Sequence, residues 1–404
     1  MNKIFFSFIF FASSVVNANG VFDGIVFQNN DSILIRDDSD QTLFAWQPDK
    51  ALVPASLVKL ATANLAINKW GLTKRFKTDF YLDGKTLWIK GYGDPFIVSE
   101  ELDLIANKLL ALKLGQIDKI SIDASFFDIA RVPGRSSAAD PYNAPLSAVS
   151  ANFNTVNLSK RNGFLKSAEP QTPLTNTAIR LAKSMRKKAE RVNLINSDNA
   201  QLNFAEMLAI KLQLQTIDIE INQVVPKSAK HVYQHLSSHT LTDVLQGTLE
   251  YSNNFMANQV FIKLGEGAVE QKPVSGLTFK VASGIAMSAL SEQFNWQHGH
   301  NIVEGSGLSR DNRLSAKHLS DLLVALEPNK TLFKKIKNKS NAQVYAKTGT
   351  LDGVRSYAGY IQLSSKKYHF VFNFNRQVAY RYRDQMLERL LQDLIARHKT
   401  SVVD

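Results

Sequence analysis

Strand-forming segments lie at both ends of this chain, and they constrain its fold more than any other feature. Residues 31–36 and 42–46 form two short extended runs around a turn-rich stretch, and residues 344–374 contain further runs rich in β-formers. A helix with a leucine-rich apolar stripe is expected at 387–395. We therefore expect one antiparallel sheet that pairs the two ends of the chain, with helices around it and the middle of the chain inserted.

The middle of the chain mixes short apolar runs with polar loops. The Asp83-Gly84 pair, between alternating apolar residues, predicts a β-hairpin. His231, His235 and His239 stand four residues apart, so we expect a partly exposed helix there. Apolar residues at helical spacing predict further helices at 56–67, 175–188, 203–214 and 241–264.

The composition excludes several classes of protein. With 44% hydrophobic and 21% charged residues over 404 positions, the chain is globular rather than disordered or collagen-like. It contains no cysteine, which excludes disulfides, thiolate metal sites and cysteine nucleophiles. A chain of this length can bury enough apolar surface to fold without such cross-links.

The first residues have the layout of a secretory signal. Lys3 gives a positive start, an apolar run fills residues 4–16, and small residues lead to Ala18. The run is too short to span a bilayer, so we expect a signal peptide at 1–18, with an uncleaved anchor as the alternative. The net charge of +12 then favours weak contact with wall polymers or membrane surfaces, and we expect no nucleic acid partner.

Ser56 and Lys59 form the first candidate catalytic pair. They stand at i and i+3 in the helix expected after Pro54, so the hydroxyl and the amine would share one face. Serine becomes a nucleophile when a base removes its proton, and a lysine kept neutral by burial or by nearby positive charge can be that base. The same spacing begins at Ser184 and at Ser364, and we interpret those two as exposed serines beside solvated lysines.

Ser252 and Asn254 form the second candidate pair, in a short turn between two helical segments. A hydroxyl at such a turn can relay a proton to a leaving group, and an amide can bind a substrate carbonyl. The Ser-x-Asn pattern also begins at Ser150 and, spelled Ser-Asp-Asn, at Ser197. We prefer Ser252 because the helices on both sides would hold its turn between rigid elements.

The third candidate is the run Lys347-Thr348-Gly349-Thr350, which contains the only Lys-Thr-Gly of the chain. It falls where a strand is expected. Glycine lets a substrate backbone approach the edge of a strand closely. The positive charge of the lysine and the threonine hydroxyls suit a carboxylate.

In this order, Ser-x-x-Lys, Ser-x-Asn and Lys-Thr-Gly are the active-site set of penicillin-interacting serine enzymes. The chain resembles the D-alanyl-D-alanine carboxypeptidase/endopeptidases of the penicillin-binding protein four type. Three further segments are similar to that family: Gly-Tyr-Gly-Asp-Pro at 91–95, Tyr-Asn-Ala-Pro-Leu-Ser-Ala at 142–148 and Gly-Ser-Gly-Leu-Ser-Arg-Asp-Asn-Arg at 305–313. The sequence departs from the family at Tyr92, Asn253 and Glu304, none of which replaces a reacting group.

The resemblance implies an α+β fold and a periplasmic location. The fold is a β-lactamase/transpeptidase-like domain, an antiparallel sheet flanked by helices, with a mixed, strand-containing domain inserted. Its implied boundaries are a discontinuous catalytic domain at 19–74 and 236–404, and an insert at 75–235. The spacing from Ser56 to Ser252 is short for the family, which implies a trimmed insert.

The resemblance also implies a role for each candidate residue. Ser56 would be acylated by the penultimate D-Ala carbonyl, with Lys59 as base and the backbone N–H groups of Ser56 and Thr350 as oxyanion hole. Lys347 would lower the pKa of Lys59 by repulsion. Ser252 and Asn254 would transfer protons and contact the substrate amide. The residues implied to bind the terminal carboxylate are in the run Lys347, Thr348, Gly349 and Thr350.

The implied substrate is a peptidoglycan peptide, with β-lactams as inhibitors and no metal or cofactor. Two alternatives stay open, a serine β-lactamase and a non-catalytic wall-binding module. The long middle segment argues against the first, and the intact candidate residues argue against the second. Trimming of D-Ala and cutting of cross-links are not distinguished. A basic stretch is interpreted as a solvated face that can also contact anionic wall polymer, and it comprises Lys330, Lys334, Lys335, Lys337 and Lys339.

Overall fold

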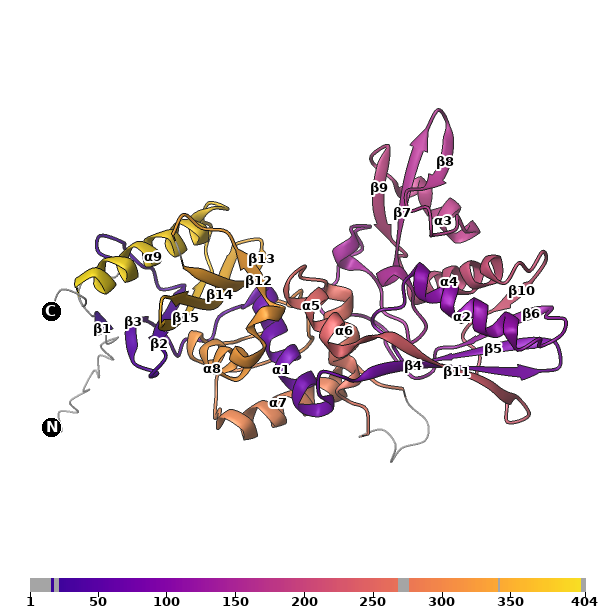
Figure 1. The fold of residues 1–404 in the computed structure, drawn as a ribbon, viewed down its shortest axis with the longest axis horizontal. Helices are drawn as coiled ribbons and strands as arrows, with labels where there is room; N and C mark the ends of the chain where they lie inside the picture. The colour runs from indigo at the N-terminus through magenta and orange to yellow at the C-terminus, as the bar shows by residue number, and fades with distance from the viewer. Residues whose placement is uncertain (1–15, 18–21, 268–275, 341, 401–404) are drawn as a thin grey trace, which may run out of the picture.

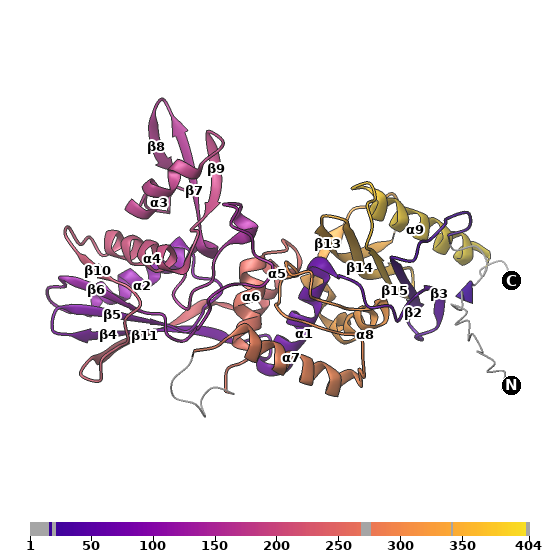
Figure 2. The ribbon, with the colours of Figure 1, turned by 180° about the vertical axis from the view of Figure 1, so that it is seen from behind.

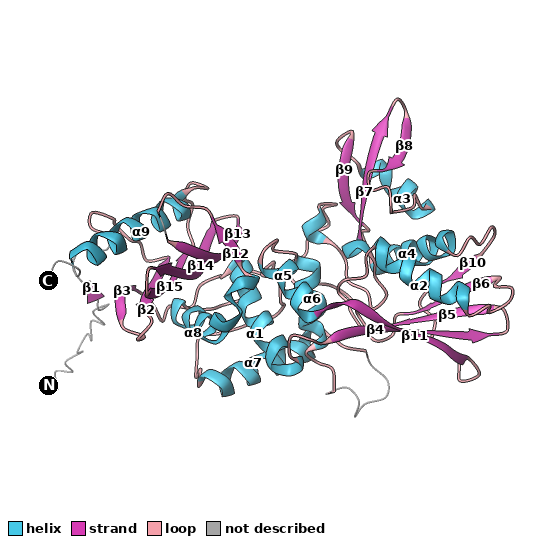
Figure 3. Cartoon of the chain, in the orientation of Figure 1, coloured by secondary structure: helices cyan, strands magenta, loops and turns pink. Residues whose placement is uncertain are grey.

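The computed structural model describes residues 16–17, 22–267, 276–340 and 342–400 (Figure 1). The predicted signal peptide at 1–18 therefore lies outside the described residues, apart from Val16–Asn17. The molecule is elongated and has two sheet-containing lobes, with helices gathered between them (Figures 2 and 3). Within the described ranges, no helix is long and apolar enough to cross a bilayer.

A seven-stranded antiparallel sheet forms the core of one lobe, and its strands come from both ends of the chain. The strand order is β1-β3-β2-β15-β14-β13-β12. The join between the two ends is the pairing of β2 with β15, in which Ile33 lies opposite Phe372. This confirms the expected sheet. Its strands are β1 (Val16–Asn17), β2 (Asp31–Asp37), β3 (Thr42–Trp46), β12 (Lys334–Ile336), β13 (Gln343–Leu351), β14 (Val354–Leu363) and β15 (Lys366–Phe374).

Alternation of side chains along the strands gives this sheet two apolar faces. In β15, Phe370 and Phe372 pack on one side, against the leucine stripe of the last helix, α9 (Tyr382–Thr400). Val371, between them, packs into the other core with Leu34 of β2. The sheet is therefore the middle layer of a three-layer lobe, as the two core clusters and Figure 3 show.

The helices on the second face carry most of the core that holds the candidate residues. The expected helix at 241–264 is two helices, because Ser252 has a φ of 60° and interrupts the helical path. We did not predict the helices at 279–294 and 316–326. The helices of this layer are α1 (Val58–Trp70), α5 (Leu241–Leu249), α6 (Asn254–Lys263), α7 (Phe279–Phe294) and α8 (Ala316–Leu326).

The inserted segment builds the other lobe around a five-stranded mixed sheet and a smaller three-stranded one. The order of the larger sheet is β10-β6-β5-β4-β11, and that of the smaller is β8-β7-β9. Strands β4 and β5 form the hairpin expected at Asp83-Gly84. The strands are β4 (Arg75–Asp83), β5 (Thr86–Gly91), β6 (Lys119–Asp123), β7 (Thr155–Arg161), β8 (Phe164–Ser167), β9 (Ala189–Asn193), β10 (Asp218–Glu220) and β11 (Lys230–Thr240).

The helices of the insert differ from the expectation. The helix expected at 175–188 shortens to α3 (Asn176–Leu181), and the one expected at 203–214 is α4 (Ser197–Lys211). Helix α2 (Ser99–Ala111), which packs with α4 over the five-stranded sheet, was not predicted.

The helix expected around the three histidines is wrong. His231, His235 and His239 lie on strand β11, which pairs with β4 along its length. Residues four apart share a face on a strand as well as on a helix, so the spacing could not separate the two structures. Of the three, His235 is buried, and its Nε2 lies 2.7 Å from Oε1 of Glu101.

Candidate active site

Ser56 stands on a tight turn at the start of the helical layer. Residues Ala55–Leu57 form a 3-10 turn that runs into α1, and Ala55 is buried with a φ of 48°. Lys59 follows one turn later, is fully buried, and places its Nζ 3.2 Å from Oγ of Ser56. The structure thus brings the first candidate pair within hydrogen-bond distance.

The amine of Lys59 also meets two acceptors from other elements. It lies 2.7 Å from Oδ1 of Asn254, at the start of α6, and 2.5 Å from the carbonyl oxygen of Ser306. Burial lowers the pKa of Lys59 to about 7, against an opposing effect of Glu304. We expected repulsion by Lys347 to lower the pKa of Lys59. Burial of the amine is instead the cause of the lowered pKa. At neutral pH, a substantial fraction of this amine is therefore unprotonated and able to act as a base.

Ser252 and Lys347 come together opposite this pair. Nζ of Lys347 lies 2.8 Å from Oγ of Ser252 and 2.8 Å from the carbonyl oxygen of Thr348. Burial, followed by the positive charges of Lys59 and Arg383, holds the pKa of Lys347 well below its ordinary value. The charge of Lys59 acts on Lys347, so the two lysines lie near each other, one on the helical layer and one on the sheet.

Strand β13 lies directly against the turn that carries Ser56 because residue 349 is glycine. A Cβ at Gly349 would lie 2.2 Å from Oγ of Ser356 and 3.0 Å from the backbone N of Ser56. Thr348 is partly buried and Thr350 is exposed beside it. The backbone N of Ser56 is therefore next to the strand that carries the expected second oxyanion donor, at Thr350.

Arg383, on the first turn of α9, holds this part of β13 from the other face. Its Nη1 donates to the carbonyl oxygen of Gly349 at 2.9 Å and to Oγ1 of Thr350 at 2.8 Å. The side chain is 5% exposed. No local sequence signal marks Arg383, since its contacts exist only once the last helix has packed on the sheet.

A loop centred on Glu304 presents the Ser306 carbonyl to Lys59. The buried carboxylate of Glu304 accepts hydrogen bonds from the backbone N of Ser306 at 2.8 Å and of Gly307 at 2.7 Å. Gly307 has a φ of 89°, and a Cβ there would lie 2.0 Å from the carbonyl oxygen of Ala55. The loop is therefore packed directly against the turn at Ala55 and Ser56.

The competing sequence patterns lie elsewhere in the structure and serve local geometry. Nδ2 of Asn199 donates to the carbonyl oxygen of Leu194 at 2.9 Å, near the start of α4. Asn152 accepts from the backbone N of Ser99 at 3.0 Å inside the insert. Oγ of Ser184 donates to the preceding turn of its own helix. The Ser-x-x-Lys pattern that begins at Ser364 ends at Lys367, which forms an ion pair with Glu327.

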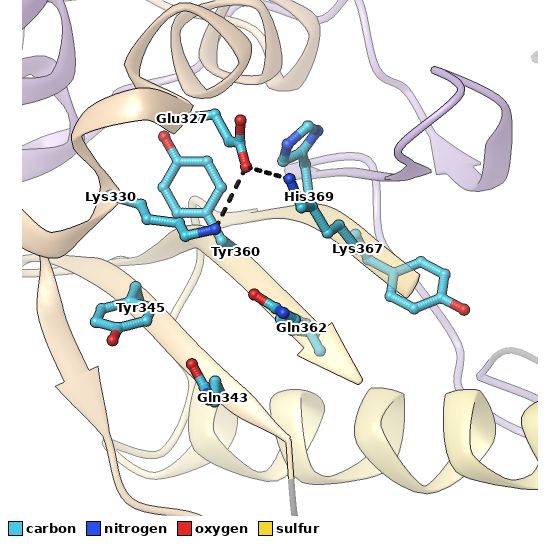
Figure 4. A pocket seen from close by; sticks show the side chains of 10 residues that line it. Glu327, Lys330, Gln343, Tyr345, Tyr360, Gln362, Lys367 and His369 are labelled. Atoms are coloured by element: carbon cyan, nitrogen blue, oxygen red, sulfur yellow. Dashed lines mark hydrogen bonds and ion pairs between the residues drawn. The ribbon is translucent and has the colours of Figure 1, made fainter. Parts of the chain in front are cut away.

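Two of the hollows in the described part of the chain differ sharply in volume, and so in the size of ligand that they can hold. A cleft of about 630 Å³ opens beside Ser252, Lys347 and Thr348. The other, of about 10 Å³, lies at the opposite end of β13, where Glu327 joins Lys330 and Lys367 (Figure 4). The second is too small for anything beyond a single water. The cleft is the candidate substrate site because Ser252, Lys347 and Thr348 line it.

Comparison with known proteins agrees with this geometry. The model of the D-Ala-D-Ala carboxypeptidase 3 (S13) family matches residues 23–189 and 171–334. The chain belongs to this family. The membership confirms the predicted family, the α+β fold with an insert and the activity class, a serine-type hydrolase of D-Ala-D-Ala peptides. The β-lactamase alternative is not favoured. A search of curated protein sequences finds no match.

Solved structures with the same fold cover nearly the whole chain. Penicillin-binding protein 4 of Haemophilus influenzae is 19% identical, with a TM-score of 0.71 over 91% of this chain and 96% of that one. Its complex with a β-lactam is also 19% identical, with a TM-score of 0.67 over 90% and 96%. A predatory peptidoglycan endopeptidase from Bdellovibrio bacteriovorus is 15% identical, with a TM-score of 0.52 over 91% and 92%.

Proposed function

We propose that Ser56 is the nucleophile of a D-Ala-D-Ala carboxypeptidase and DD-endopeptidase acting on peptidoglycan peptides, with Lys59 as its base. The observation that carries this assignment is the 3.2 Å approach of Lys59 Nζ to Ser56 Oγ, in surroundings that lower the pKa of Lys59 to about 7. The solved complex of penicillin-binding protein 4 with a β-lactam, and the endopeptidase activity named for the Bdellovibrio protein, support the substrate class.

The acylation step follows from these positions. Ser56 Oγ attacks the carbonyl carbon of the penultimate D-Ala while Lys59 takes the hydroxyl proton. The backbone N–H groups of Ser56 and Thr350 donate to the developing oxyanion, which is the term usually worth most in acyl transfer.

Departure of the leaving group uses the facing residues. A proton passes to the departing nitrogen through Ser252, whose Oγ is 2.8 Å from Nζ of Lys347. Asn254 binds the substrate amide and holds Lys59. Lys347, Thr348 and Thr350 bind the carboxylate beside the scissile bond. Water then hydrolyses the ester on Ser56 and restores the enzyme.

Covalent labelling tests the nucleophile. Fluorescent penicillin should label the wild-type protein, and mass spectrometry should place the adduct on Ser56. The Ser56→Ala variant should remain folded and unlabelled. The matched variants Ser184→Ala and Ser364→Ala, at the other two Ser-x-x-Lys positions, should label normally. A folded wild-type protein that takes no label would refute the assignment.

The products distinguish the two peptidase activities. Purified muropeptides that lose one D-Ala identify a carboxypeptidase, and cross-linked dimers converted to monomers identify an endopeptidase. Rapid turnover of nitrocefin, in place of a stable acyl-enzyme, would instead favour the β-lactamase alternative.

The location and boundaries belong to the same proposal. Residues 1–18 direct export to the periplasm, residues 19–74 with 236–404 form the catalytic domain, and residues 75–235 form the insert. Strand β4 begins the insert's sheet at Arg75, which supports the first boundary, whereas β11 carries that sheet as far as Thr240, beyond the second. The weak contact of the basic surface with wall polymer or membrane is also retained as a proposal.

A further inference from the structure

The cleft beside Lys347 is larger than the proposed reaction needs on that side. Lys347 and Thr348 bind the carboxylate of the departing residue, so the cleft they open into lies on the leaving-group side. A departing D-Ala has only six non-hydrogen atoms, whereas the cleft has a volume of about 630 Å³. Volumes of this order hold ligands of several tens of atoms. Most of the cleft is therefore left empty by the smallest leaving group.

The walls of this cleft are strongly basic. Three exposed lysines reach it from β12 and the residue that follows, Lys334, Lys335 and Lys337. Lys347 and Arg383 bring the number of cationic side chains to five, against two carboxylates, Glu250 and Asp384. Walls of one sign around a concave surface concentrate ligands of the opposite charge.

Arg383 adds a donor that is already built into the site. The side chain is only 5% exposed, and its Nη1 donates to the carbonyl oxygen of Gly349 and to Oγ1 of Thr350. Its Nε is buried and has no hydrogen-bond partner among the described residues. The rings of Tyr357 and Tyr380 lie 5.9 Å and 5.4 Å from Cζ and line the same cleft. The guanidinium therefore places a buried positive charge at the wall of the cleft, which favours an anionic ligand there.

We propose that this cleft binds a second carboxylate on the leaving group, so that the enzyme selects departing residues with an acidic side arm over a single D-Ala. This rests on the proposed function, because Lys347 and Thr348 are taken to hold the first carboxylate. A cross-linked peptide provides such a leaving group, since the departing amine belongs to a peptide with further carboxylates. The site therefore favours cutting of cross-links over trimming.

Two synthetic substrates test this selection directly. Both have one acyl peptide that ends in D-Ala, joined in one case to D-norleucine and in the other to D-2-aminoadipate. The two side arms have nearly the same shape, and only the second ends in a carboxylate. We expect kcat/KM to be about tenfold higher or more for D-2-aminoadipate, as for one charge-assisted contact.

Variants locate the effect in the cleft. Lys334→Gln with Lys337→Gln should bring the ratio of the two kcat/KM values close to one. Each single variant should reduce it in part, which keeps the test usable if the double variant does not fold. Lys317→Gln, at an exposed lysine on the first turn of α8, removes the same charge and should leave both kcat/KM values unchanged.

Penicillin labelling of Ser56 separates the two levels of the argument. A labelled wild-type enzyme with a ratio near one, or a ratio that survives the double substitution, would overturn the second-carboxylate site and leave the proposed function standing. Absence of labelling would instead overturn the proposed function, and this inference with it.

Discussion

Burial lowers the pKa of Lys59 to about 7, and this has a measurable consequence for its proposed role as base. Because the neutral form is the base, the rate of acylation should rise with pH. It should increase about tenfold per pH unit well below 7 and level off above about 8. The measurement is the pseudo-first-order rate of labelling by fluorescent penicillin, from about pH 5 to about pH 9. A rate independent of pH across this range would remove Lys59 from the base role.

Asn254 offers a way to move that profile. Its Oδ1 lies 2.7 Å from Nζ of Lys59, so Asn254→Asp places a carboxylate beside the amine and stabilises its charged form. The midpoint of the acylation profile should shift upward by about one pH unit or more. Asn253→Asp is the matched control, since Asn253 caps α6 and accepts from the backbone N of Met256. Its shift should be distinctly smaller.

The candidate residues themselves could be predicted from the sequence because their types and order carry the chemistry. Ser56, Lys59, Ser252 and Lys347 lie in one place in the structure. What the sequence did not reveal are the groups that act through the backbone or only after packing. The carbonyl of Ser306 has no side-chain signature, and Arg383 reaches β13 only from a helix at the far end of the chain.

At the scale of elements, the loop at 304–309 packs closely against the turn that carries Ser56. Gly307→Ala adds a Cβ that would lie 2.0 Å from the carbonyl oxygen of Ala55, at a φ of 89°. We expect a loss of about 1–3 kcal/mol in the free energy of unfolding. Displacement of Ser56 should also slow acylation by about 100-fold or more. Unfolding by denaturant measures the change in free energy of unfolding, and the rate of penicillin labelling measures the change in acylation.

Gly284→Ala is the matched control for that substitution. Gly284 lies inside α7, and a Cβ there would meet nothing within 4 Å. Alanine should therefore stabilise the helix by about 0.5–1 kcal/mol and leave acylation unchanged. Equal effects of the two substitutions on acylation would contradict the packing argument.

The elements predicted well from the sequence are those with a single apolar face or clear β-formers, such as β13–β15 and α9. Helix α2 was missed although its buried residues Leu102, Ile105, Ala106 and Leu109 follow helical spacing, so in this case the signal was present in the sequence. Strand β11 was misassigned because a spacing of four residues fits both helix and strand. Only its pairing with β4 decides between them, and that pairing is not local.

At the scale of the whole molecule, the insert has its own apolar core, separate from the core beneath the active site. Glu101 of α2 stabilises it through His235 and Ser238 of β11, with Oε1 2.7 Å from the backbone N of Ser238. Burial opposes ionisation of this carboxyl, but these hydrogen bonds prevail and lower its pKa to about 2.

The pKa of Glu101 determines when this stabilisation is present. A lowered pKa stabilises the fold above the ordinary carboxyl value of 4.5, and the effect is lost as pH falls toward about 2. Glu101→Gln should therefore lower the melting temperature at neutral pH and bring the two proteins closer together in acid. Acylation of Ser56 below the melting temperature should stay the same. A melting difference that does not change with pH would contradict this assignment.

The pairing of β2 with β15 has a consequence for when the sheet can form during synthesis of the chain. Ser56 and Lys59 leave the ribosome before β13, β14, β15 and Arg383 do. Until those strands have been made, the proposed nucleophile and base lack the proposed oxyanion donor at Thr350 and the cleft beside Lys347. We therefore expect a growing chain that still lacks these strands to show no hydrolytic activity.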